Sequence, residues 1–346
     1  MISRLLMLSS LVLVALSGFA APAFVAPAMA ADHAVILMYH RFGETQFPST
    51  NIRLEQLDAH IQELKSGPYT VLRVAEIISK IKSGTPLPDR TVGITVDDGF
   101  KSVYEEAWPR LARANLPFTV FISTDPCDEK RASYLTWDEV REMKAAGVDF
   151  GAHTASHLHM TAATPAQNEA EIKKSNERLG AELGEMPSLF AYPFGEAGTE
   201  VIETARVGGY AFSFGQHSGV VQQNSDFNYL PRFAMNENFG NPDRFKLIVN
   251  TLPLPVTGFT PRDTKIGTVN PPNLAFTAAP GLKNLSGLAC YISGEGRVPV
   301  TLLGTNRIEI RASKPFSKGR TRLNCTLLGA SGRWHWLGTL FVRPKT

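Results

Sequence analysis

Two adjacent acidic residues are the first candidates for chemistry in this chain of 346 residues. Asp97 and Asp98 follow the apolar run 94–96 and precede Gly99, which can turn the chain. Because neighbouring carboxylates repel each other, the pKa of one should rise unless a cation or a hydrogen-bond donor lies between them. The pair therefore predicts a metal ion close by.

Two histidines supply matching ligands. His153 and His157 follow the strand-like run 148–152 and lie four residues apart, a spacing that on a helical turn places both imidazoles on one face. One carboxylate of the aspartate pair and the two histidines leave coordination positions open for water and substrate, as in catalytic metal sites. Zinc suits this set, with cobalt and nickel as alternatives. Each pattern alone is ordinary, since Asp-Asp-Gly is more often a turn, but together they predict one divalent metal ion.

The other histidines and one cysteine carry weaker signals. His159 is displaced from the face of the histidine pair and is expected at the surface. His33, His60 and His335 have no motif around them and are interpreted as structural. Cys127 has no evident base partner, so we interpret it as a spectator and not as a nucleophile.

The first thirty residues have the pattern of a secretory signal peptide. Arg4 precedes the apolar run 5–20, and Ala28-Met29-Ala30 forms a small-residue exit. A membrane anchor is the alternative, but the run is shorter than the roughly 20 residues that a span needs, and prolines interrupt its sequel. We therefore expect residues 1–30 to be cleaved, and the mature chain to be periplasmic or secreted with no membrane span.

Composition and charge divide the mature chain. A hydrophobic content of 43% with 19% charged residues excludes disorder and coiled coil. Prolines crowd the segment after residue 252, so we expect domains at 31–254 and 255–346. The first holds 21 Lys and Arg against 29 Asp and Glu, and the second 13 against 3, giving net charges of −8 and +10.

The basic domain predicts attraction to an anionic cell-envelope polymer; a solvated surface docked on the acidic domain is the alternative. We expect no nucleic-acid partner.

The pattern of residues 31–254 predicts an α/β fold. Strand-like runs alternate with helix-like stretches, as in a parallel sheet with crossover helices, and capping boxes at Thr136 and Thr164 mark two helix starts. The predicted strands cover 34–39, 91–96, 118–122, 148–152, 189–192, 210–214 and 230–235. They fit a distorted (β/α)7-type barrel with its chemistry at the C-terminal rim. Short strand-like runs in 255–346 predict a small all-β sandwich-like domain.

Two pairs of residues stand out in the C-terminal domain. Export leads to an oxidising compartment, so Cys290 and Cys325 can pair, and such a bridge would stabilise the fold by roughly 3–4 kcal/mol. Trp334 and Trp336 point the same way on a strand. They are either a sugar-stacking platform or core residues near the disulfide.

The stretch 34–235 resembles the NodB-homology polysaccharide deacetylases, carbohydrate esterase family 4. The run Thr95-Val96-Asp97-Asp98-Gly99 is similar to the first family motif, T-F-D-D-G, with Val in place of Phe. The run from His153 to His157 is similar to the second, H-[ST]-x-x-H. The resemblance implies that Asp97 is the general base, and that Asp98 and the two histidines hold a divalent metal.

The third family motif, R-x-P-[YF]-G, is matched only in part. Ala191 stands where the family has an arginine that is thought to orient the base. Arg232, at another strand end, is a candidate replacement, the alternative being an ordinary surface or ion-paired arginine. Tyr192, Pro193 and Phe194 follow Ala191, and together with Arg232 we assign them to the substrate site. The backbone N–H of Tyr192 is the expected oxyanion donor, although the aromatic rings also suit a core.

Two further histidines complete the candidate site. His217 is the only histidine left downstream within the barrel and is our candidate for the general acid, the alternative being a loop residue without a role. The run Met38-Tyr39-His40-Arg41 resembles the entry motif of the exported, poly-N-acetylglucosamine-deacetylase-like branch of the family. This resemblance implies that His40 lies on the rim near the substrate.

The leading hypothesis is metal-assisted removal of N-acetyl groups from an N-acetylglucosamine-containing polysaccharide or oligosaccharide, with Asp97 as base. Chitin-like polymers, peptidoglycan and exopolysaccharide all remain open. One alternative is a metal-dependent O-acetyl esterase acting on a glycan. The other is a non-catalytic carbohydrate-binding protein on the same fold, which the missing arginine and the uncertain acid suggest.

Overall fold

The central sheet is built from the apolar runs that the sequence predicts as strands. The structure, a computed structural model, describes residues 30–344, so the predicted signal peptide lies outside the described residues apart from Ala30. Six parallel neighbours follow the path β2-β7-β8-β9-β10-β11. Their bounds are β2 (His33–Tyr39), β7 (Thr91–Val96), β8 (Thr119–Ile122), β9 (Asp149–Ala152), β10 (Leu189–Ala191) and β11 (Phe212–Phe214).

The seventh predicted strand makes the sheet curl. β13 (Phe233–Ala234) pairs in parallel with β2, placing Phe233 opposite Leu37. Leu230, three residues earlier, bridges Phe214 of β11. One short segment therefore contacts strands from both ends of the six-strand path. The sheet is mixed, since β12 (Val221–Gln222) runs antiparallel to β2, and β5 (Thr70–Val71) adds a parallel pairing to β7.

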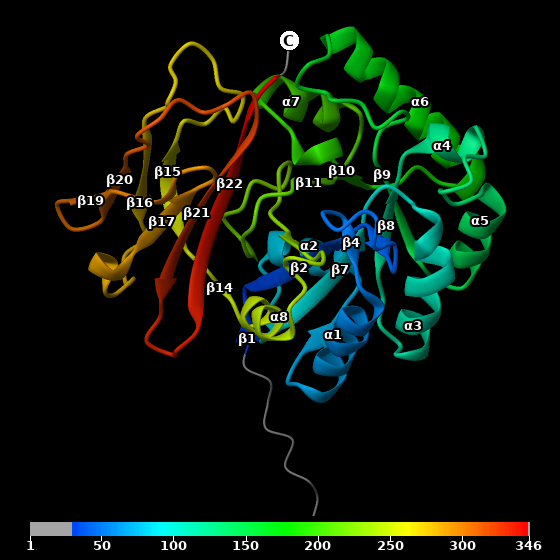
Figure 1. Ribbon diagram of the computed structural model, residues 1–346, viewed down its shortest axis with the longest axis horizontal. Coiled ribbons are helices and arrows are strands. Elements are labelled where there is room, and N and C mark those ends of the chain that lie inside the picture. Colours follow the sequence, from blue (N-terminus) through cyan, green and yellow to red (C-terminus); the bar gives the residue numbers. More distant parts are fainter. Residues whose placement is uncertain (1–29, 345–346) are drawn as a thin grey trace, which may run out of the picture.

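Helices cover the outside of the curled sheet (Figure 1). They are α1 (Leu54–Ser66), α2 (Val74–Ser83), the π-helical turn Val103–Ala107, α3 (Trp108–Arg113), α4 (Thr124–Asp128), α5 (Trp137–Ala145), α6 (Pro165–Leu183), α7 (Thr199–Val207) and α8 (Pro242–Val249). Both predicted capping boxes are confirmed: Thr136 caps α5 by accepting from the Glu139 N–H, and Thr164 caps α6 by accepting from the Gln167 N–H. No helix within residues 30–344 is long and apolar enough to cross a membrane.

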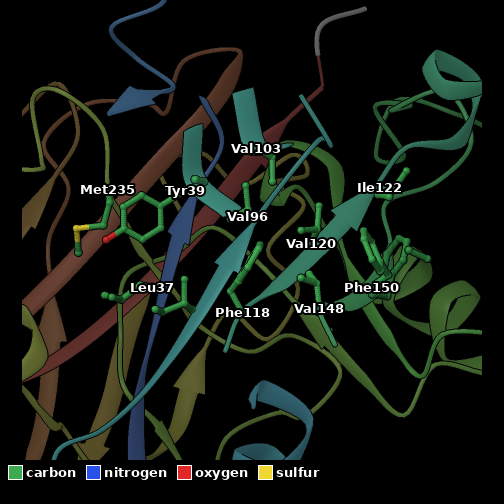
Figure 2. Packing of buried hydrophobic residues seen from close by; sticks show 14 of the residues in the cluster. Leu37, Tyr39, Val96, Val103, Phe118, Val120, Ile122, Val148, Phe150 and Met235 are labelled. Carbon is green, nitrogen blue, oxygen red and sulfur yellow. The ribbon is translucent and has the colours of Figure 1, made fainter. Parts of the chain in front are cut away.

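The core lies on both faces of the sheet. Along β2, Val35, Leu37 and Tyr39 belong to one buried cluster, whereas Ala34 and Ile36 belong to another. This alternation reflects the two-residue period of a strand whose two faces are both covered. Figure 2 shows the first cluster, in which side chains of β2, β7, β8 and β9 pack together. The sheet is thereby held rigid beneath the loops at its C-terminal edge.

The C-terminal part contains two sheets. One has the order β14-β22-β21-β17-β18, and the other β15-β16-β20-β19. The bounds are β14 (Leu252–Pro253), β15 (Val256–Thr260), β16 (Leu274–Ala278), β17 (Ala289–Ile292), β18 (Gly296–Val298), β19 (Val300–Leu303), β20 (Arg307–Ile310), β21 (Gly319–Leu328) and β22 (Trp334–Arg343), with a 3-10 turn at Leu285–Gly287. Phe276 of β16 and Phe341 of β22 share one buried cluster, so the sheets pack face to face as in a sandwich.

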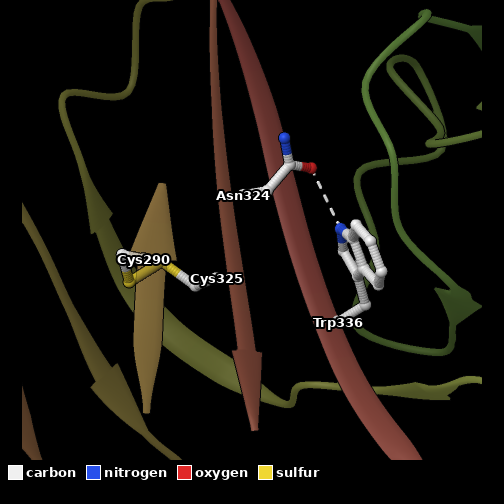
Figure 3. The surroundings of a disulfide bond; sticks show 4 residues. All are labelled: Cys290, Asn324, Cys325 and Trp336. Atoms are coloured by element: carbon white, nitrogen blue, oxygen red, sulfur yellow. Dashed lines mark hydrogen bonds between the residues drawn. A yellow bond between two sulfur atoms is a disulfide. The ribbon is translucent and has the colours of Figure 1, made fainter. Parts of the chain in front are cut away.

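Cys290 and Cys325 form a disulfide between β17 and β21, where they are direct cross-strand neighbours (Figure 3). Cys127 is free and buried. Burial raises the pKa of its thiol to about 12, so it is unreactive at neutral pH, consistent with a spectator.

Strand β22 docks the C-terminal part against the curled sheet. The ring of Trp336 lies edge-on to Phe233 of β13 at 5.4 Å between centroids, and its indole N–H donates to Asn324 Oδ1 (Figure 3). A side chain at Gly338 is excluded, because a Cβ there would lie 2.1 Å from the carbonyl oxygen of Ser218. Trp336 is therefore a docking residue and not half of an open sugar platform.

Two short strand pairs complete the fold. β1 (Ala30–Ala31) pairs antiparallel with β6 (Leu87–Pro88), and β3 (Arg41–Phe42) pairs in parallel with β4 (Asn51–Ile52). The second pair extends from the end of β2, so it lies at the edge of the sheet where the candidate site is found.

Candidate active site

The two adjacent aspartates follow the end of β7, and their side chains contact different partners. Asp97 is fully buried, and its backbone N–H donates to the carbonyl of Tyr39 at 2.9 Å. Asp98 has φ 74° and Gly99 has φ 73°, both in the left-handed region. Such a conformation costs free energy in a non-glycine residue, so the fold stores strain at Asp98. Like-charge repulsion is relieved because each carboxylate has its own positive or polar neighbours.

Asp98, His153 and His157 converge, as the sequence predicts. Asp98 Oδ1 lies 3.2 Å from His153 Nε2 and 3.1 Å from His157 Nε2, and one donor atom from each residue lies within 4.8 Å of the others. Asp98 Oδ1 and His153 Nε2 are buried and have no hydrogen-bond partner within residues 30–344. Buried polar atoms without partners are costly. The orphaned atoms and the chemistry of the donors therefore fit a divalent cation.

A second contact prepares His153 for ligation. Its Nδ1 donates to the backbone carbonyl of Ala191 at 2.6 Å, which leaves Nε2 as the bare nitrogen that faces Asp98. Such an outer hydrogen bond fixes both the tautomer and the ring orientation of a metal-binding histidine. The residue at position 191 thus serves the site through its backbone.

The histidine loop is not the helical turn that the four-residue spacing suggests. Residues 153–159 form no helix, and Thr154 and His157 have φ 61° and 64°. Thr154 Oγ1 accepts hydrogen bonds from the backbone N–H groups of His157 and Leu158 at 3.1 and 3.3 Å. Two left-handed residues and a side-chain cap bring the imidazoles together, so the helical expectation was wrong although the pairing was right.

Glu171 of α6 supports this loop and was missed from the sequence. Its carboxylate accepts from the backbone N–H groups of Ala155 and Ser156 at 3.0 and 2.8 Å, and from Ser156 Oγ at 2.8 Å. Three bonds from one side chain hold the peptide units between the histidines. Glu171 lies within a polar helix where nothing in its neighbours marks it, so only the tertiary contact reveals its function.

Arg232 lies against Asp97 and not at an open substrate surface. Both residues are fully buried, and the guanidinium donates two bonds to the carboxylate, Nη1 to Oδ1 at 2.6 Å and Nη2 to Oδ2 at 2.8 Å. It also donates to Thr95 Oγ1 and to the carbonyl of Gly215, both at 3.0 Å. Burial acts to raise the pKa of Asp97, but the charges of Arg232, His153 and His40 and the hydrogen bond from Arg232 together lower that pKa. These contacts occupy the donors of Arg232, and its assignment to the substrate site stays a prediction.

His40 lies beside the same carboxylate. Its Nε2 is 3.8 Å from Asp97 Oδ2 and 3.5 Å from Gln216 Nε2, and its side chain is 12% exposed. Burial is the main reason that the pKa of His40 is lowered, although the aspartates nearby oppose the shift. The imidazole therefore stands between the buried base and the solvent side of the rim, where the resemblance placed it.

His217 is largely buried. Its ring packs on Tyr229 at 4.5 Å between centroids, and only 7% of the residue is exposed. Burial, aided by the charges of Arg232 and Arg322, lowers the pKa of His217 to about 3, so the imidazole is neutral at neutral pH. The role of His217 as the general acid stays a prediction.

Only one residue of the third motif reaches the rim. Tyr192 is fully buried, its backbone N–H donates to the carbonyl of Phe214 at 3.0 Å, and its hydroxyl donates to the carbonyl of Asn228. The expected oxyanion donor is therefore already engaged in the sheet. Pro193 is buried as well.

Phe194, with φ 60°, is the member of this motif that reaches the site. Its ring lies edge-on to His157 at 4.3 Å and stacks on His159 at 3.6 Å between centroids. His159 is half exposed, as predicted, yet the stack connects it to the ligand loop. Phe194 is thus the aromatic wall of the candidate site.

The other expected structural histidines have buried or local contacts. His60 accepts from the Tyr39 hydroxyl and donates to the carbonyl of Gly240, both at 2.9 Å. His335 donates to the carbonyl of Pro253 at 2.7 Å, and His33 contacts Asp32. None of them belongs to the donor cluster that the described residues form.

The fold and the site together are similar to those of the NodB-type deacetylases. Residues 84–213 match the family model for polysaccharide deacetylase. Among solved structures, the Streptococcus pyogenes deacetylase PplD in complex with acetate is 25% identical, with a TM-score of 0.58, and the match covers 63% of this chain and 98% of that one. IcaB from Ammonifex degensii shares the fold at 23% identity, with a TM-score of 0.55 and coverage of 62% and 98%.

Comparison with curated proteins agrees with this assignment. The poly-beta-1,6-N-acetyl-D-glucosamine N-deacetylase of Staphylococcus aureus strain MSSA476 is 25% identical over 234 residues, which cover 60% of this chain and 80% of the relative. The chain is therefore similar to the polysaccharide deacetylases of carbohydrate esterase family 4, which are hydrolases that act on amide bonds.

Proposed function

We propose that this chain is a metal-dependent N-deacetylase of an N-acetylglucosamine-containing glycan. The observation that carries the proposal is the convergence of Asp98, His153 and His157 beside a second carboxylate that is held ionised. Asp98 Oδ1 and His153 Nε2 are buried without a hydrogen-bond partner among residues 30–344. The named activity of the staphylococcal relative supports the choice of an N-acetylated glucosamine polymer.

Each residue has a distinct task. Asp98, His153 and His157 would hold the cation, which when bound supplies Lewis acidity toward the acetyl carbonyl and acidifies water. Asp97 is the general base, because it is ionised, adjacent to the donor cluster and engaged by only one positive partner on its two oxygens. Arg232 is a positioning residue that locks both oxygens of that base and replaces the arginine missing at position 191.

His40 delivers the proton to the departing amine. Of the two candidate histidines, His40 is partly exposed and lies 3.8 Å from Asp97, whereas His217 is buried against Tyr229. A proton taken by Asp97 can pass to His40 over this short distance once the leaving nitrogen needs it. We therefore assign the acid to His40.

The setting we propose is outside the cytoplasm. Residues 1–30 direct export, residues 31–254 form the deacetylase domain, and residues 255–346 form the accessory domain. The disulfide Cys290–Cys325 supports an oxidising compartment.

The direct test is acetate release by the full mature chain from N-acetylglucosamine oligomers, peptidoglycan and O-acetylated glycans, with and without a chelator. We expect chelation to abolish release and re-addition of Zn²⁺ to restore it. Asp97→Asn should lower kcat by about 10²–10⁴-fold, the range for loss of a general base, with an unchanged content of bound metal. Asp138→Asn, the same substitution at a carboxylate that is 92% exposed, is the matched control.

Product analysis separates the alternatives. Free amine identifies N-deacetylation, and free hydroxyl identifies an O-acetyl esterase. Folded, metal-loaded protein that releases no acetate from any of these glycans would contradict the proposal and favour a carbohydrate-binding function. The main argument for a non-catalytic carbohydrate-binding protein is the alanine at position 191. The two bonds from Arg232 to Asp97 weaken this argument, because they supply an arginine to that carboxylate.

A further inference from the structure

A basic cleft lies where the C-terminal part meets the candidate active site. It encloses a cavity of about 570 Å³ between the rim of the curled sheet and strands β21 and β22. The sheet side is formed by His159, Phe194 and Glu196. The opposite side carries four cationic side chains: Lys318, Arg320, Arg322 and Arg343.

Within residues 30–344, one carboxylate lines this cleft together with four cationic side chains. This group, Glu196, accepts from His159 Nδ1 at 2.9 Å and from Thr161 Oγ1 at 3.3 Å. Arg320 is its nearest cation, at 3.8 Å. Within residues 30–344, neither Arg322 nor Arg343 has a carboxylate at ion-pair distance. The walls therefore create a positive potential that attracts anions.

The position of Arg322 makes this charge informative. The side chain is only partly exposed, and burial together with the charge of Arg320 lowers its pKa. A guanidinium that is removed from water beside another cation loses free energy unless an anion compensates it. An anionic ligand in the cleft would supply that compensation through charge-assisted hydrogen bonds.

Phe194 connects the cleft to the metal-binding residues. Its ring contacts His157 at 4.3 Å on one side and lines the cleft on the other. Arg320 Nη1 donates to the carbonyl oxygen of Phe194 at 3.1 Å, and its guanidinium lies 5.6 Å from the ring centre. A sugar whose acetyl group sits at the donor cluster is thus separated from the cationic wall by a single aromatic side chain.

We propose that this cleft binds an acidic substituent of the glycan, so that the preferred substrate is an anionic N-acetylated glycan and the C-terminal part contributes to substrate selection. The chemistry required is a carboxylate or phosphate on a sugar next to the one that is deacetylated. The inference rests on the proposed deacetylase function. It gives the basic C-terminal part a task within the active site, beyond attachment to an envelope surface.

The test compares kcat/KM for acetate release by the full mature chain from three oligosaccharide series of equal length: neutral, carboxylate-bearing and phosphate-bearing N-acetylglucosamine oligomers. We expect one acidic series to be preferred by about tenfold or more over the neutral series, the size of a charge-assisted contact. The two acidic series show which anion the cleft accepts. Raising the salt concentration should reduce the preference.

Variants locate the effect. The double variant Arg322→Gln and Arg343→Gln should lower the acidic-to-neutral ratio of kcat/KM about tenfold, mainly through KM. Its matched control, Arg297→Gln and Arg311→Gln, removes the same charge from exposed positions outside the cleft and should preserve the ratio. Direct binding of a non-hydrolysable acidic oligosaccharide, measured by calorimetry, should weaken in the first variant alone.

Two results would overturn the inference, and they differ. Equal turnover of acidic and neutral oligomers, with an identical ratio in both double variants, would remove the cleft as a selectivity site and leave the deacetylase intact. No acetate release from any series by metal-loaded protein would remove the proposed function, and the role of the cleft in substrate selection with it.

Discussion

The interior around Asp97 and the basic cleft beside Phe194 differ in whether their charged side chains have partners of opposite charge. Inside the sheet, Arg232 and Asp97 are both fully buried and each oxygen of the carboxylate receives its own donor. In the cleft, Arg322 and Arg343 line a cavity with no paired carboxylate among the described residues. The charges of Arg232 and Asp97 balance each other without a ligand, whereas Arg322 and Arg343 have no carboxylate within residues 30–344 to balance theirs.

This difference separates catalysis from recognition. A general base must be held in one place and must be ionised before it accepts a proton, which a buried bidentate pair achieves at a desolvation cost. A recognition surface must keep its charge available for an incoming group. Mutations of the buried Arg232–Asp97 pair should therefore lower both the free energy of unfolding and kcat. Mutations in the cleft should change substrate preference and leave the free energy of unfolding nearly unaffected.

Arg232→Met gives the largest expected change in stability. The Asp97 carboxylate would remain buried without its counter-charge, which costs about 3–5 kcal/mol of unfolding free energy. Urea unfolding of the full chain measures this loss. Arg206→Met is the control, since its pair with Glu203 is more than half exposed on both sides and should contribute within about 1 kcal/mol. Equal midpoints for the two variants would refute the buried pair.

The disulfide allows the stability of the sheet that carries the cleft arginines to be tested separately. Cys325 lies on β21, the strand that carries Arg320 and Arg322, and its bridge to Cys290 closes a separation of 35 residues. Replacing both cysteines by serine should lower the unfolding free energy by about 3–4 kcal/mol. A reductant should lower the unfolding midpoint of the parent chain and leave the double variant unchanged. A similar response in both would show that the bridge contributes nothing.

The pH dependence of the unfolding free energy tests the burial of His60. His60 is buried between Tyr39, Gly240 and Phe245, and burial lowers its pKa from 6.5 to about 4. The folded chain resists protonation that the unfolded chain accepts, so this stability is complete above pH 6.5 and is lost as the pH falls toward 4. The loss amounts to about 3 kcal/mol at most.

Urea midpoints measured across this pH range provide the check. His60→Gln removes the titrating group and should flatten the dependence, whatever it does to stability at neutral pH. An unchanged slope would mean that His60 is not the group that titrates.

The smallest expected effect concerns the two tryptophans of β22. Trp336→Phe removes the indole bond to Asn324 and should cost about 1 kcal/mol, because Phe keeps much of the packing on Phe233. Trp334 is 37% exposed, so Trp334→Phe should change the unfolding free energy by less than about 0.5 kcal/mol. Loss of glycan binding in the Trp334 variant would support the sugar-stacking hypothesis for this residue. Glycan recognition would then not be confined to the basic cleft.

The sequence was sufficient for the strands and for the cluster of donor side chains. Each of the seven predicted strand segments contains a strand, because runs buried on both faces are continuous in sequence and carry a clear signal. Asp98, His153 and His157 were found because each follows such a run, and because parallel strands bring their carboxyl ends to one edge.

Features that depend on tertiary contacts were not predictable. Glu171 supports the histidine loop from a helix 15 or 16 residues away, and Arg320 meets Phe194 across 126 residues. His217 was assigned as the acid from its position in the chain, yet its burial on Tyr229 is a property of packing. Arg232 was recognised as a charge at a strand end, while its partner emerged only from the curl that brings β13 against β2.

The close approach of Gly338 to Ser218 has a consequence for shortened forms of this protein. Strand β22 passes so near the loop that carries Gln216 and His217 that no side chain fits between them. A chain cut after residue 254 would lose the wall that fixes this loop and would leave Phe233 uncovered. Cleavage near residue 254 would therefore expose apolar surface and loosen the loop beside the candidate site, so the two parts are best expressed and studied together.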